Sequence, residues 1–481
     1  MRGTLIRRSF AAAAACTAAV VLAPASGSGA DLAPRPNVVV ITTDDQTYDS
    51  LRFMPRVRSL LGAQGMTFTR NFASLPLCCP SRVTFLTGQY AHNHGVLFND
   101  PPKGGFPAFH DATDDLPLWL QAVGYRTALV GKYLNGYPGA LGPTEVQPGW
   151  NDWFTPVIPG DTAYYDYTMN DNGVLVPFGH APADYSTDVL ADRAVSVVNS
   201  MAPQPEPFFL WFTPRAPHTV RASVNPNPPP APRHIGAYAS EQLPRPPSFN
   251  ERDISDKPRS IGDRPSLSQN DILKLEARYR AAIESLLAED EAVERIVNAL
   301  DASGEMANTL IIFTSDNGYF YGEHRLVSGK ERVYEEATHV PLIMRGPGIP
   351  PGTVRGDLTA NIDLASTIAD AANATPQIKQ DGISLLPLAR NPGTKSRRKE
   401  ILFEARSYSA VRTRRYVYAR YKNGAEELYD LKHDPYEIKS LDDSPKLSGI
   451  KARLARQLAA LRDCAGKSCR GGVRNRSSSH G

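Results

Sequence analysis

Short apolar runs that each end in polar residues constrain the fold of this 481-residue chain most strongly. Residues 37–42 read Asn-Val-Val-Val-Ile-Thr, a continuous run with β-branched residues that is typical of a strand buried on both faces. A helical period is clearest over residues 271–300, where apolar side chains recur every three or four positions. Further strand-like runs lie at residues 127–130, 208–212, 310–314 and 342–344. The alternation predicts an α/β fold with a mainly parallel or mixed central sheet covered by helices on both faces.

Polar residues follow four of these runs, at the point where each predicted strand ends. Open α/β sheets bind ligands at the carboxyl ends of their strands. We therefore expect these side chains to meet at one edge of the sheet and to form a functional site. In chain order they are Asp44 with Asp45, Lys132, His218, and Asp316 with Asn317.

Residues 78–88 form the most distinctive run, Cys-Cys-Pro-Ser-Arg-Val-Thr-Phe-Leu-Thr-Gly. Two adjacent cysteines alone could be a metal half-site, a redox pair or small buried hydrophobes. A metal half-site does not require the Pro, Ser and Arg that follow the cysteines, nor the Leu-Thr-Gly ending. A helix beginning near Ser81 would direct backbone N–H groups and a positive dipole end at residue 78. The run therefore predicts that an anion binds at Cys78.

This run resembles the Cys-x-Pro-Ser-Arg-x-x-x-Leu-Thr-Gly pattern of the sulfatase family, and the resemblance covers residues 37–441. It implies an alkaline-phosphatase-like fold and the hydrolysis of sulfate monoesters. In that family a formylglycine-generating enzyme oxidises the first cysteine to formylglycine (3-oxoalanine), an aldehyde whose hydrate supplies the nucleophilic oxygen. The resemblance therefore implies that Cys78 is the modified residue and that Cys79 occupies the variable position.

The resemblance also implies a metal site. Asp44 and Asp45 match the family's first metal-binding pair, and Asp316 and Asn317 match the second. By itself, an Asp-Asp pair after a strand is more often a helix cap or a solvated turn. Together with the oxygen of a modified Cys78, the two pairs would form an all-oxygen site. Such a site suits a hard divalent cation, with Ca²⁺ expected before Mg²⁺, rather than Zn²⁺.

Further catalytic roles follow from the same resemblance. Arg82 would hold the formylglycine and counter negative charge, and Asp316 would take a proton from the aldehyde hydrate. Lys132 and Lys330 match lysines that contact the sulfate and the leaving oxygen, and His218 matches the histidine that protonates the departing alcohol. The implied reaction is attack of the hydrate oxygen on sulfur. Collapse of the sulfated group then restores the aldehyde and releases sulfate.

One position departs from the common pattern. Many family members carry a histidine two residues after the lysine that matches Lys132, but this chain has Leu134. The Gly-Lys-Tyr-Leu-Asn sequence, with the double cysteine, instead resembles N-acetylglucosamine-6-sulfatases and extracellular heparan sulfatases. Sugar sulfates, including N-acetylglucosamine 6-sulfate, and aryl sulfates are therefore the expected substrates. His94 and Asn135 are the candidate bases for regenerating the aldehyde.

Other functions remain open at this point. A phosphodiester or phosphonate monoester hydrolase could use the same fold, because related sites accept either tetrahedral anion. If Cys78 stays unmodified, the chain could instead be a non-catalytic binder of sulfated glycans. A zinc or redox protein built on Cys78 and Cys79 is the remaining alternative.

The first thirty residues are typical of an export signal. Arg2, Arg7 and Arg8 precede an apolar run that small residues follow. The Arg-Arg-Ser-Phe sequence also resembles a twin-arginine signal, which predicts a bacterial protein that is secreted or periplasmic. No later segment is apolar enough to predict a membrane span. The net charge of +3 gives no indication of a nucleic-acid partner.

A chain of 481 residues is too long for one compact core of ordinary size, which predicts two domains. A proline-rich stretch at 224–265 is expected to be a surface insertion that is either passive or shapes the substrate cleft. Cys464 and Cys469 are expected to form a disulfide in an oxidising compartment. The expected divisions are a signal peptide (1–30), a catalytic domain (35–390), a small domain of antiparallel strands with a closing helix (400–465) and a disordered tail (470–481).

Overall fold

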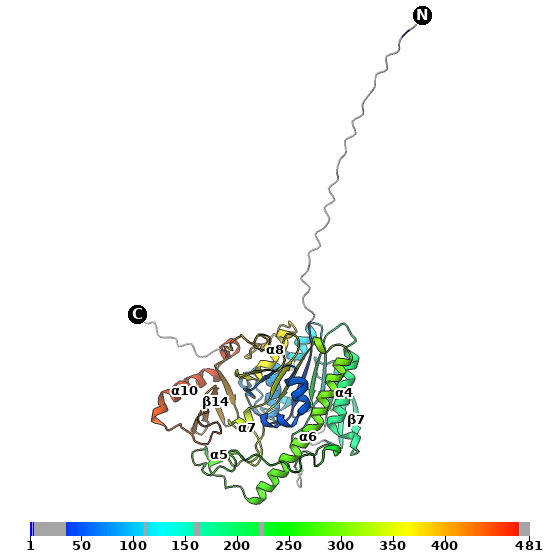
Figure 1. The fold of residues 1–481 in the computed structure, drawn as a ribbon. Helices are drawn as coiled ribbons and strands as arrows, with labels where there is room; N and C mark the ends of the chain where they lie inside the picture. Colours follow the sequence, from blue (N-terminus) through cyan, green and yellow to red (C-terminus); the bar gives the residue numbers. More distant parts are fainter. Residues whose placement is uncertain (2, 4–34, 110–112, 158–163, 221–225, 471–481) are drawn as a thin grey trace. The chain divides into compact units, whose positions relative to one another are not determined.

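The computed structural model of the chain describes residues 1, 3, 35–109, 113–157, 164–220 and 226–470 (Figure 1). The expected signal peptide lies outside these ranges except for residues 1 and 3. The expected tail lies outside them except for Arg470. Among the residues that are described, no helix has the length and apolar character needed to cross a membrane.

A ten-stranded mixed sheet forms the centre of the fold, in the order β11-β2-β10-β9-β1-β8-β4-β5-β6-β7. Its five central strands are parallel to one another, and β10 and β6 join them antiparallel on either side. The central strands are β9 (Thr309–Ser315), β1 (Asn37–Thr43), β8 (Phe208–Thr213), β4 (Arg126–Gly131) and β5 (Asp152–Pro156), and β10 is Leu342–Arg345. All five predicted strand runs are strands of this sheet, which confirms the α/β fold class.

The central strand β1 shows why the sheet needs cover on both faces. All seven of its residues are buried. Val38 and Val40 belong to the hydrophobic cluster on one face, whereas Val39 and Ile41 belong to the cluster on the other. Successive side chains of a strand point to opposite faces, so a run without polar residues requires two apolar layers.

Helices supply those two layers. Side chains of α1 (Cys78–Thr87), α3 (Leu116–Ala122), α8 (Ile362–Ala371) and α9 (Leu386–Arg390) pack in the first cluster. Side chains of α4 (Ser186–Met201) and α6 (Gln269–Ala302) pack in the second, and these two helices lie side by side (Figure 1). The predicted helix at 271–300 is α6, which begins two residues earlier because Ser268 and Asp271 form a capping box.

The strands at the sheet edges were not predicted from the sequence. Most of them are short and include polar residues, whereas β7 at one edge is an apolar run, Val-Leu-Val-Pro-Phe, that contains a proline and is mostly exposed. They are β2 (Met66–Phe68), β11 (Thr353–Arg355), β6 (Tyr167–Asp171) and β7 (Val174–Phe178), and a separate pair is formed by β3 (Asn71–Phe72) and β12 (Thr359–Ala360).

Short helices occupy several of the connections. They are η1 (Tyr48–Phe53), η2 (Val57–Gly62), α2 (Ala91–His94), η3 (Phe106–Ala108), η4 (Pro182–Asp184), η5 (Pro232–His234), α5 (Arg259–Gly262), η6 (Met306–Asn308), α7 (Glu335–Thr338), η7 (Pro445–Leu447) and η8 (Gly466–Cys469). Two of them, η5 and α5, belong to the proline-rich stretch. Its described part buries Leu243 and Ile254 and is therefore packed rather than loose.

A second, four-stranded antiparallel sheet follows near the C-terminus, as predicted. Its order is β13 (Glu400–Glu404), β14 (Tyr408–Thr413), β15 (Tyr416–Tyr421) and β16 (Glu426–Asp430). The helix α10 (Ser448–Arg462) buries Leu454 and Leu458 against it. The same cluster includes Phe72 and Tyr334, so the small sheet shares a continuous core with the rest of the fold.

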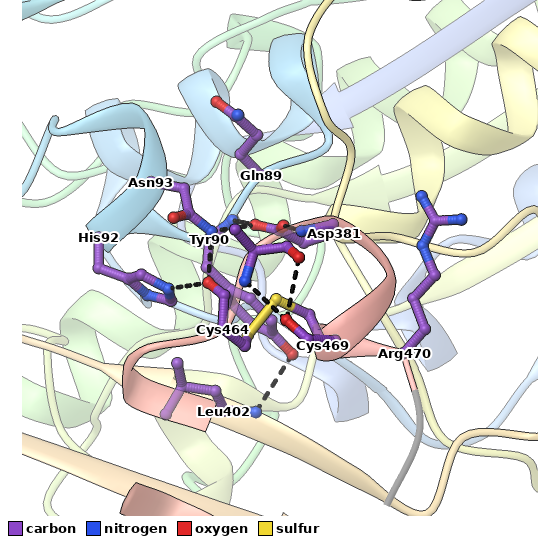
Figure 2. Close-up of a disulfide and its surroundings, with 12 residues drawn as sticks. Gln89, Tyr90, His92, Asn93, Asp381, Leu402, Cys464, Cys469 and Arg470 are labelled. Carbon is purple, nitrogen blue, oxygen red and sulfur yellow. Dashed lines mark hydrogen bonds between the residues drawn. A yellow bond between two sulfur atoms is a disulfide. The ribbon is translucent and has the colours of Figure 1, made fainter. Parts of the chain in front are cut away.

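The expected disulfide between Cys464 and Cys469 is confirmed, and the loop that it closes packs against α2 (Figure 2). The carbonyl oxygen of Cys464 accepts a hydrogen bond from Asn93 Nδ2 at 2.9 Å and lies 2.8 Å from His92 Nε2. Asp381 joins the two sides, because its carboxylate accepts from Asn93 Nδ2 and from the N–H of Gly466. Since α2 follows α1 closely in the chain, the loop also supports the position of α1.

We expect removal of this disulfide to lower thermal stability without changing the fold. The closed loop has a sequence separation of only 5, so the loss is about 2 kcal/mol. Thermal melts of the Cys464→Ala, Cys469→Ala double variant should show a melting temperature lower by a few degrees. A reductant should lower the melting temperature of the unaltered protein to a similar extent and leave the variant unchanged. Equal melting temperatures for both proteins would contradict the prediction.

Candidate active site

The registers of the central strands bring two predicted polar pairs together. Thr43, the last residue of β1, pairs with Ser315, the last residue of β9. Asp44 and Asp316 come directly after these partners, and the N–H of Asp316 donates to the carbonyl of Thr43 at 3.1 Å. The two acidic pairs, more than 270 positions apart in the sequence, are therefore adjacent in the fold.

Lys132 reaches the same place from the other side of β8. Gly131 at the end of β4 pairs with Thr213 at the end of β8, and the N–H of Lys132 donates to the carbonyl of Thr213 at 2.8 Å. Gly131 has φ of +118°, and a Cβ at this position would lie 2.2 Å from the Thr213 carbonyl oxygen. Only glycine permits this approach, which sets the direction in which Lys132 leaves the sheet.

Asp45 has an unusual backbone that links the two acidic pairs. Its φ is +69°, in the left-handed region that Asp enters more readily than most residues. In this conformation its N–H donates to Asp316 Oδ1 at 3.2 Å. Its own carboxylate accepts from Asn317 Nδ2 at 2.5 Å. The strained turn is therefore held by the second acidic pair.

Cys78 is the first residue of α1, which corrects the expectation that this helix begins near Ser81. The preceding Leu77 has an extended backbone, and the N–H of Ser81 already donates to the carbonyl of Leu77 at 3.0 Å. Pro80 fits the first turn because no intrahelical hydrogen bond is required from its nitrogen there. Cys78 therefore belongs to the positive end of the helix rather than facing it.

The side chain of Cys78 is buried among charged groups. Its Sγ lies 3.4 Å from Asp44 Oδ1 and 2.7 Å from Lys330 Nζ. Burial, together with Asp44, raises the pKa of the Cys78 thiol to about 12. Lys330 comes from the loop between β9 and α7, and its ammonium also contacts Asp45 Oδ1. Burial opposes the charge of Lys330, but Asp45 and its neighbours hold the lysine pKa well above its usual range.

Two cations neutralise Asp44 and Asp316. Lys132 Nζ lies 2.6 Å from Asp44 Oδ2. Burial acts to raise the pKa of Asp44, but Lys132 and the other nearby cations hold that pKa well below its usual value. Arg82 Nε donates to Asp316 Oδ2 at 2.9 Å, and Arg82 Nη2 lies 3.6 Å from Asp44 Oδ2. Burial and the nearby Asp44 raise the pKa of Asp316 to about 6.

Arg82 has a further positioning role. Its Nη1 donates to the carbonyl of Lys132 at 2.8 Å and to Thr213 Oγ1 at 2.5 Å. One fully buried guanidinium thus connects α1 to the ends of β1, β4, β8 and β9. Removing one partner of such a buried network leaves uncompensated charges and is strongly destabilising.

His218 closes the cluster on its more accessible side. Its Nε2 lies 3.6 Å from Asp45 Oδ2, and its side chain is 16% exposed, whereas that of Asp45 is 4% exposed. Nδ1 lies 2.5 Å from the carbonyl oxygen of Thr219, so this nitrogen carries a proton and donates. Burial lowers the pKa of His218 to about 3. Nε2 is therefore the nitrogen that faces the site.

The donor set fits a divalent cation. Ligand atoms of Asp44, Asp45, Cys78 and His218 all lie within 4.8 Å of one another. The amide oxygen of Asn317 is buried beside them and has no hydrogen-bond partner among the described residues. A buried polar atom without a partner is costly, and a cation would satisfy this one. Carboxylate and amide oxygens are the donors that Ca²⁺ and Mg²⁺ prefer.

Two of the candidates from the sequence lie apart from these contacts. The ring nitrogens of His94 lie 3.0 Å from Thr84 Oγ1 and 3.2 Å from the N–H nitrogen of Val96. The carbonyl of Asn135 accepts from the N–H of Phe106 at 2.7 Å, and its side-chain oxygen is buried. No contact joins either side chain to Cys78 within the described ranges.

Two residues of the site were not predicted from the sequence. Thr213 accepts a hydrogen bond from Arg82, as described above. Arg215 is buried near Asp44 and Cys78, and its Nη2 lies 3.1 Å from His218 Nδ1. Thr213 is the last residue of β8 and Arg215 lies between it and His218, so the polar residues at the end of that strand were the signal that could have found them.

Comparisons with known proteins identify a family over most of the chain. The family model described as Sulfatase matches residues 36–374, and that of the N-sulphoglucosamine sulphohydrolase C-terminal region matches residues 322–464. The chain is 31% identical to an N-acetylglucosamine-6-sulfatase of Capra hircus, over 91% of this chain and 85% of that protein. It is 33% identical to an arylsulfatase of Chlamydomonas reinhardtii, over 95% of this chain and 78% of that protein.

A similar fold occurs in a protein solved in complex with its substrate D-glucosamine-2-N,6-O-disulfate. The TM-score is 0.74 and the identity is 24%, and the match covers 89% of this chain and 97% of the other.

Proposed function

Because this chain belongs to the sulfatase family and is a sulfuric ester hydrolase, we propose that it removes 6-O-sulfate from N-acetylglucosamine units. We further propose that formylglycine at Cys78 and one divalent cation take part in the reaction. The contact of Cys78 with both Asp44 and Lys330 at the positive end of α1 carries this proposal. The similarity to an N-acetylglucosamine-6-sulfatase over most of both chains supports the substrate.

The residues around Cys78 have complementary tasks. Lys132 and Lys330 bind the sulfate oxygens, where two buried ammonium groups stabilise charge that moves onto them. Arg82 keeps Asp44 and Asp316 ionised and in place. A cation held by the acidic pairs, with Ca²⁺ expected before Mg²⁺, would supply Lewis-acid polarisation of the sulfate ester. A formylglycine hydrate at position 78 would supply the nucleophilic oxygen.

His218 carries the proton for the leaving alcohol. Its Nδ1 is engaged by the Thr219 carbonyl, which fixes the ring and presents Nε2 to the site. Binding of the anionic sulfate ester beside the ring favours protonation of Nε2. A sugar alcohol is a poor leaving group, so transfer of that proton to its oxygen lowers the barrier to breaking the S–O bond. Arg215 and Tyr164 hold this segment, because Arg215 Nη2 donates to the Thr219 carbonyl at 3.3 Å and Tyr164 donates to the His218 carbonyl at 2.9 Å.

Substrate turnover tests the proposed function. We expect N-acetylglucosamine 6-sulfate to have a higher kcat/KM than the 3-sulfate isomer. Nitrophenyl sulfate should have a kcat/KM at least ~100-fold above that of a nitrophenyl phosphonate monoester. A reversed order for the sulfate and phosphonate esters would support the phosphonate monoester hydrolase instead. Binding of sulfated sugars without turnover, by protein whose Cys78 has been modified, would support a non-catalytic binder.

We expect removal of the divalent cation to reduce activity. Loss of several kcal/mol of charge stabilisation predicts about a 100-fold lower kcat after dialysis against a chelator. Ca²⁺ should restore activity more fully than Mg²⁺, and a melt should show a higher melting temperature in the restored protein. Full activity in dialysed protein whose metal content is shown to be negligible would contradict the prediction.

Export forms part of the proposal. The disulfide between Cys464 and Cys469 supports an oxidising compartment. The signal-like residues 1–30, with their paired arginines, support secretion or periplasmic export from a bacterium. We also propose that the formylglycine-generating enzyme is a maturation partner, and that residues 35–390 and 400–465 are the catalytic and small domains.

A further inference from the structure

A cavity of about 370 Å³ lies between the small C-terminal sheet and the segments that lead into it. Its walls come from the segment after β11, the segment before β13, the turn between β14 and β15, and α10; β14 and α10 are labelled in Figure 1. None of its lining residues belongs to the candidate active site. The cavity is large enough for a sugar unit.

The lining of this cavity is strongly basic. Its two carboxylates are already engaged: Asp357 with Arg355 at 2.7 Å, and Glu400 with Gln457. Two of the cations also have partners, because Arg398 contacts buried Asp363 and Arg415 makes a two-point contact with Asp430. The five lining cations are Arg398, Lys399, Arg414, Arg415 and Arg453.

Three of these cations lack an ion-pair partner among the described residues. Within the part of the chain that the structure describes, no hydrogen bond or ion pair joins Lys399, Arg414 or Arg453 to another side chain. All three are exposed, and they come from three separate segments. Arg70 lies near Arg414, and its pKa is lowered by burial and then by the charge of Arg414. The positive field therefore extends beyond the lining residues. Such a set of guanidinium and ammonium groups is suited to sulfate and carboxylate groups.

Neutral groups in the same cavity suit the rest of a sugar. Ser396 adds a hydroxyl group, and the amide oxygen of Gln457 has no hydrogen-bond partner among the described residues, so both can bond sugar hydroxyls. Tyr416 adds an aromatic ring against which Arg415 packs at 5.0 Å. Anion-binding cations beside hydroxyl, amide and aromatic groups match a sulfated saccharide better than a free inorganic anion.

We propose that this cavity is a second glycan-binding site, which holds a sulfated sugar unit of a polymeric substrate away from the catalytic residues. The proposal rests on the proposed function, because it assumes that the chain acts on sulfated glycans. The site would increase affinity for oligosaccharides over monosaccharides, since two linked units bind at once. Turnover of small aryl sulfates would not depend on it.

The test compares two triple variants that remove the same charge. The site variant carries Lys399→Ser, Arg414→Ser and Arg453→Ser. The control variant carries Lys422→Ser, Arg456→Ser and Arg462→Ser, which are also exposed on the small domain but do not line the cavity. The probe is a fluorescent heparin octasaccharide, measured at about 0.1 M salt, where surface charges are only partly screened. Thermal melts verify that both variants are folded.

We expect the site variant to raise the octasaccharide Kd about tenfold, because each exposed charge contact that it removes contributes only modestly in water. The control variant should change it less than about twofold. KM for the octasaccharide should rise in parallel, with kcat for nitrophenyl sulfate unchanged. Equal losses of binding in both variants would overturn the proposal in favour of diffuse charge attraction. If inorganic sulfate at an equal molar concentration displaced the probe, the site would bind sulfate alone and not a sulfated sugar. If a DNA strand of matched charge bound equally tightly, the site would not be selective for glycans.

These outcomes are separate from a failure of the proposed function. The binding measurement requires no turnover, so the site can be established even if N-acetylglucosamine 6-sulfate is not hydrolysed. Conversely, normal turnover of the monosaccharide with equal octasaccharide binding in all three proteins would retain the proposed function and remove the second site.

Discussion

Replacement of Cys78 by alanine is expected to reduce the turnover of sulfate esters by at least ~10⁴-fold, as loss of an enzyme's nucleophile typically does. Cys79→Ala is the matched control, because Cys79 is equally buried but packs in the hydrophobic cluster beneath α1. We expect the control to retain activity within a few fold and to lose about 1 kcal/mol of stability through the small cavity it leaves. Similar activity losses in both variants would contradict the assignment of the nucleophile.

Mass spectrometry reads the chemical state of the two cysteines directly. Trypsin should release residues 71–82 as one peptide, because it cleaves after Arg70 and after Arg82 and no lysine or arginine lies between them. After thiol alkylation we expect Cys79 to carry the label and Cys78 to be present as the aldehyde or its hydrate. Alkylation of both cysteines calls for co-expression with a formylglycine-generating enzyme. A Cys78 that remains a thiol after co-expression would contradict the mechanism.

Replacement of His218 by glutamine is expected to separate substrates by their leaving groups. General acid catalysis contributes about 10²–10⁴-fold, so kcat for N-acetylglucosamine 6-sulfate should fall by roughly 10³-fold. Nitrophenol leaves readily without a proton, so kcat for nitrophenyl sulfate should fall far less. Burial lowers the pKa of His218 to about 3, and a bound sulfate ester opposes that effect by placing negative charge beside the ring.

The measurement is kcat across a series of sulfate esters with leaving groups of increasing pKa. For the variant, log kcat should decrease more steeply with leaving-group pKa than for the unaltered protein. His180→Gln is the control, because that histidine is largely exposed and pairs with Asp166 rather than with the site. Parallel lines for His218→Gln and the unaltered protein would show that His218 positions the substrate without donating a proton.

The central sheet could be predicted because its strands contain apolar runs that are visible in the sequence. Strands β1, β8 and β9 are buried on both faces, so each contains at least four consecutive apolar residues, and these runs can be recognised without tertiary information. The edge strand β7 is also an apolar run, but its Pro177 argues against a strand and its side chains are largely exposed. The start of α1 was misplaced by three residues, because Pro80 is compatible with both the first turn and the residue before a helix.

The candidate site could be predicted where the type of a residue and its position after a strand indicated its chemistry. Acidic, amide and basic residues directly after strands identified Asp44, Asp316 and Lys132. Arg215 was missed because it does not follow its strand directly, and only the fold shows that it is buried beside Asp44. His94 was proposed from residue type alone, and the fold places its ring against Thr84 and Val96.

The fold class, the cysteine motif and the residues able to bind an anion and a cation could be recognised from the amino-acid sequence, because burial and chemistry restrict residue type locally. The contacts between segments that are distant in the chain could be recognised only in the fold. It placed Lys330, from a loop without a regular pattern, against Cys78 and Asp45. It also gathered Lys399, Arg414 and Arg453 around one cavity. Such contacts depend on strand register and on the packing of distant segments, and neither can be read from the local sequence around a residue.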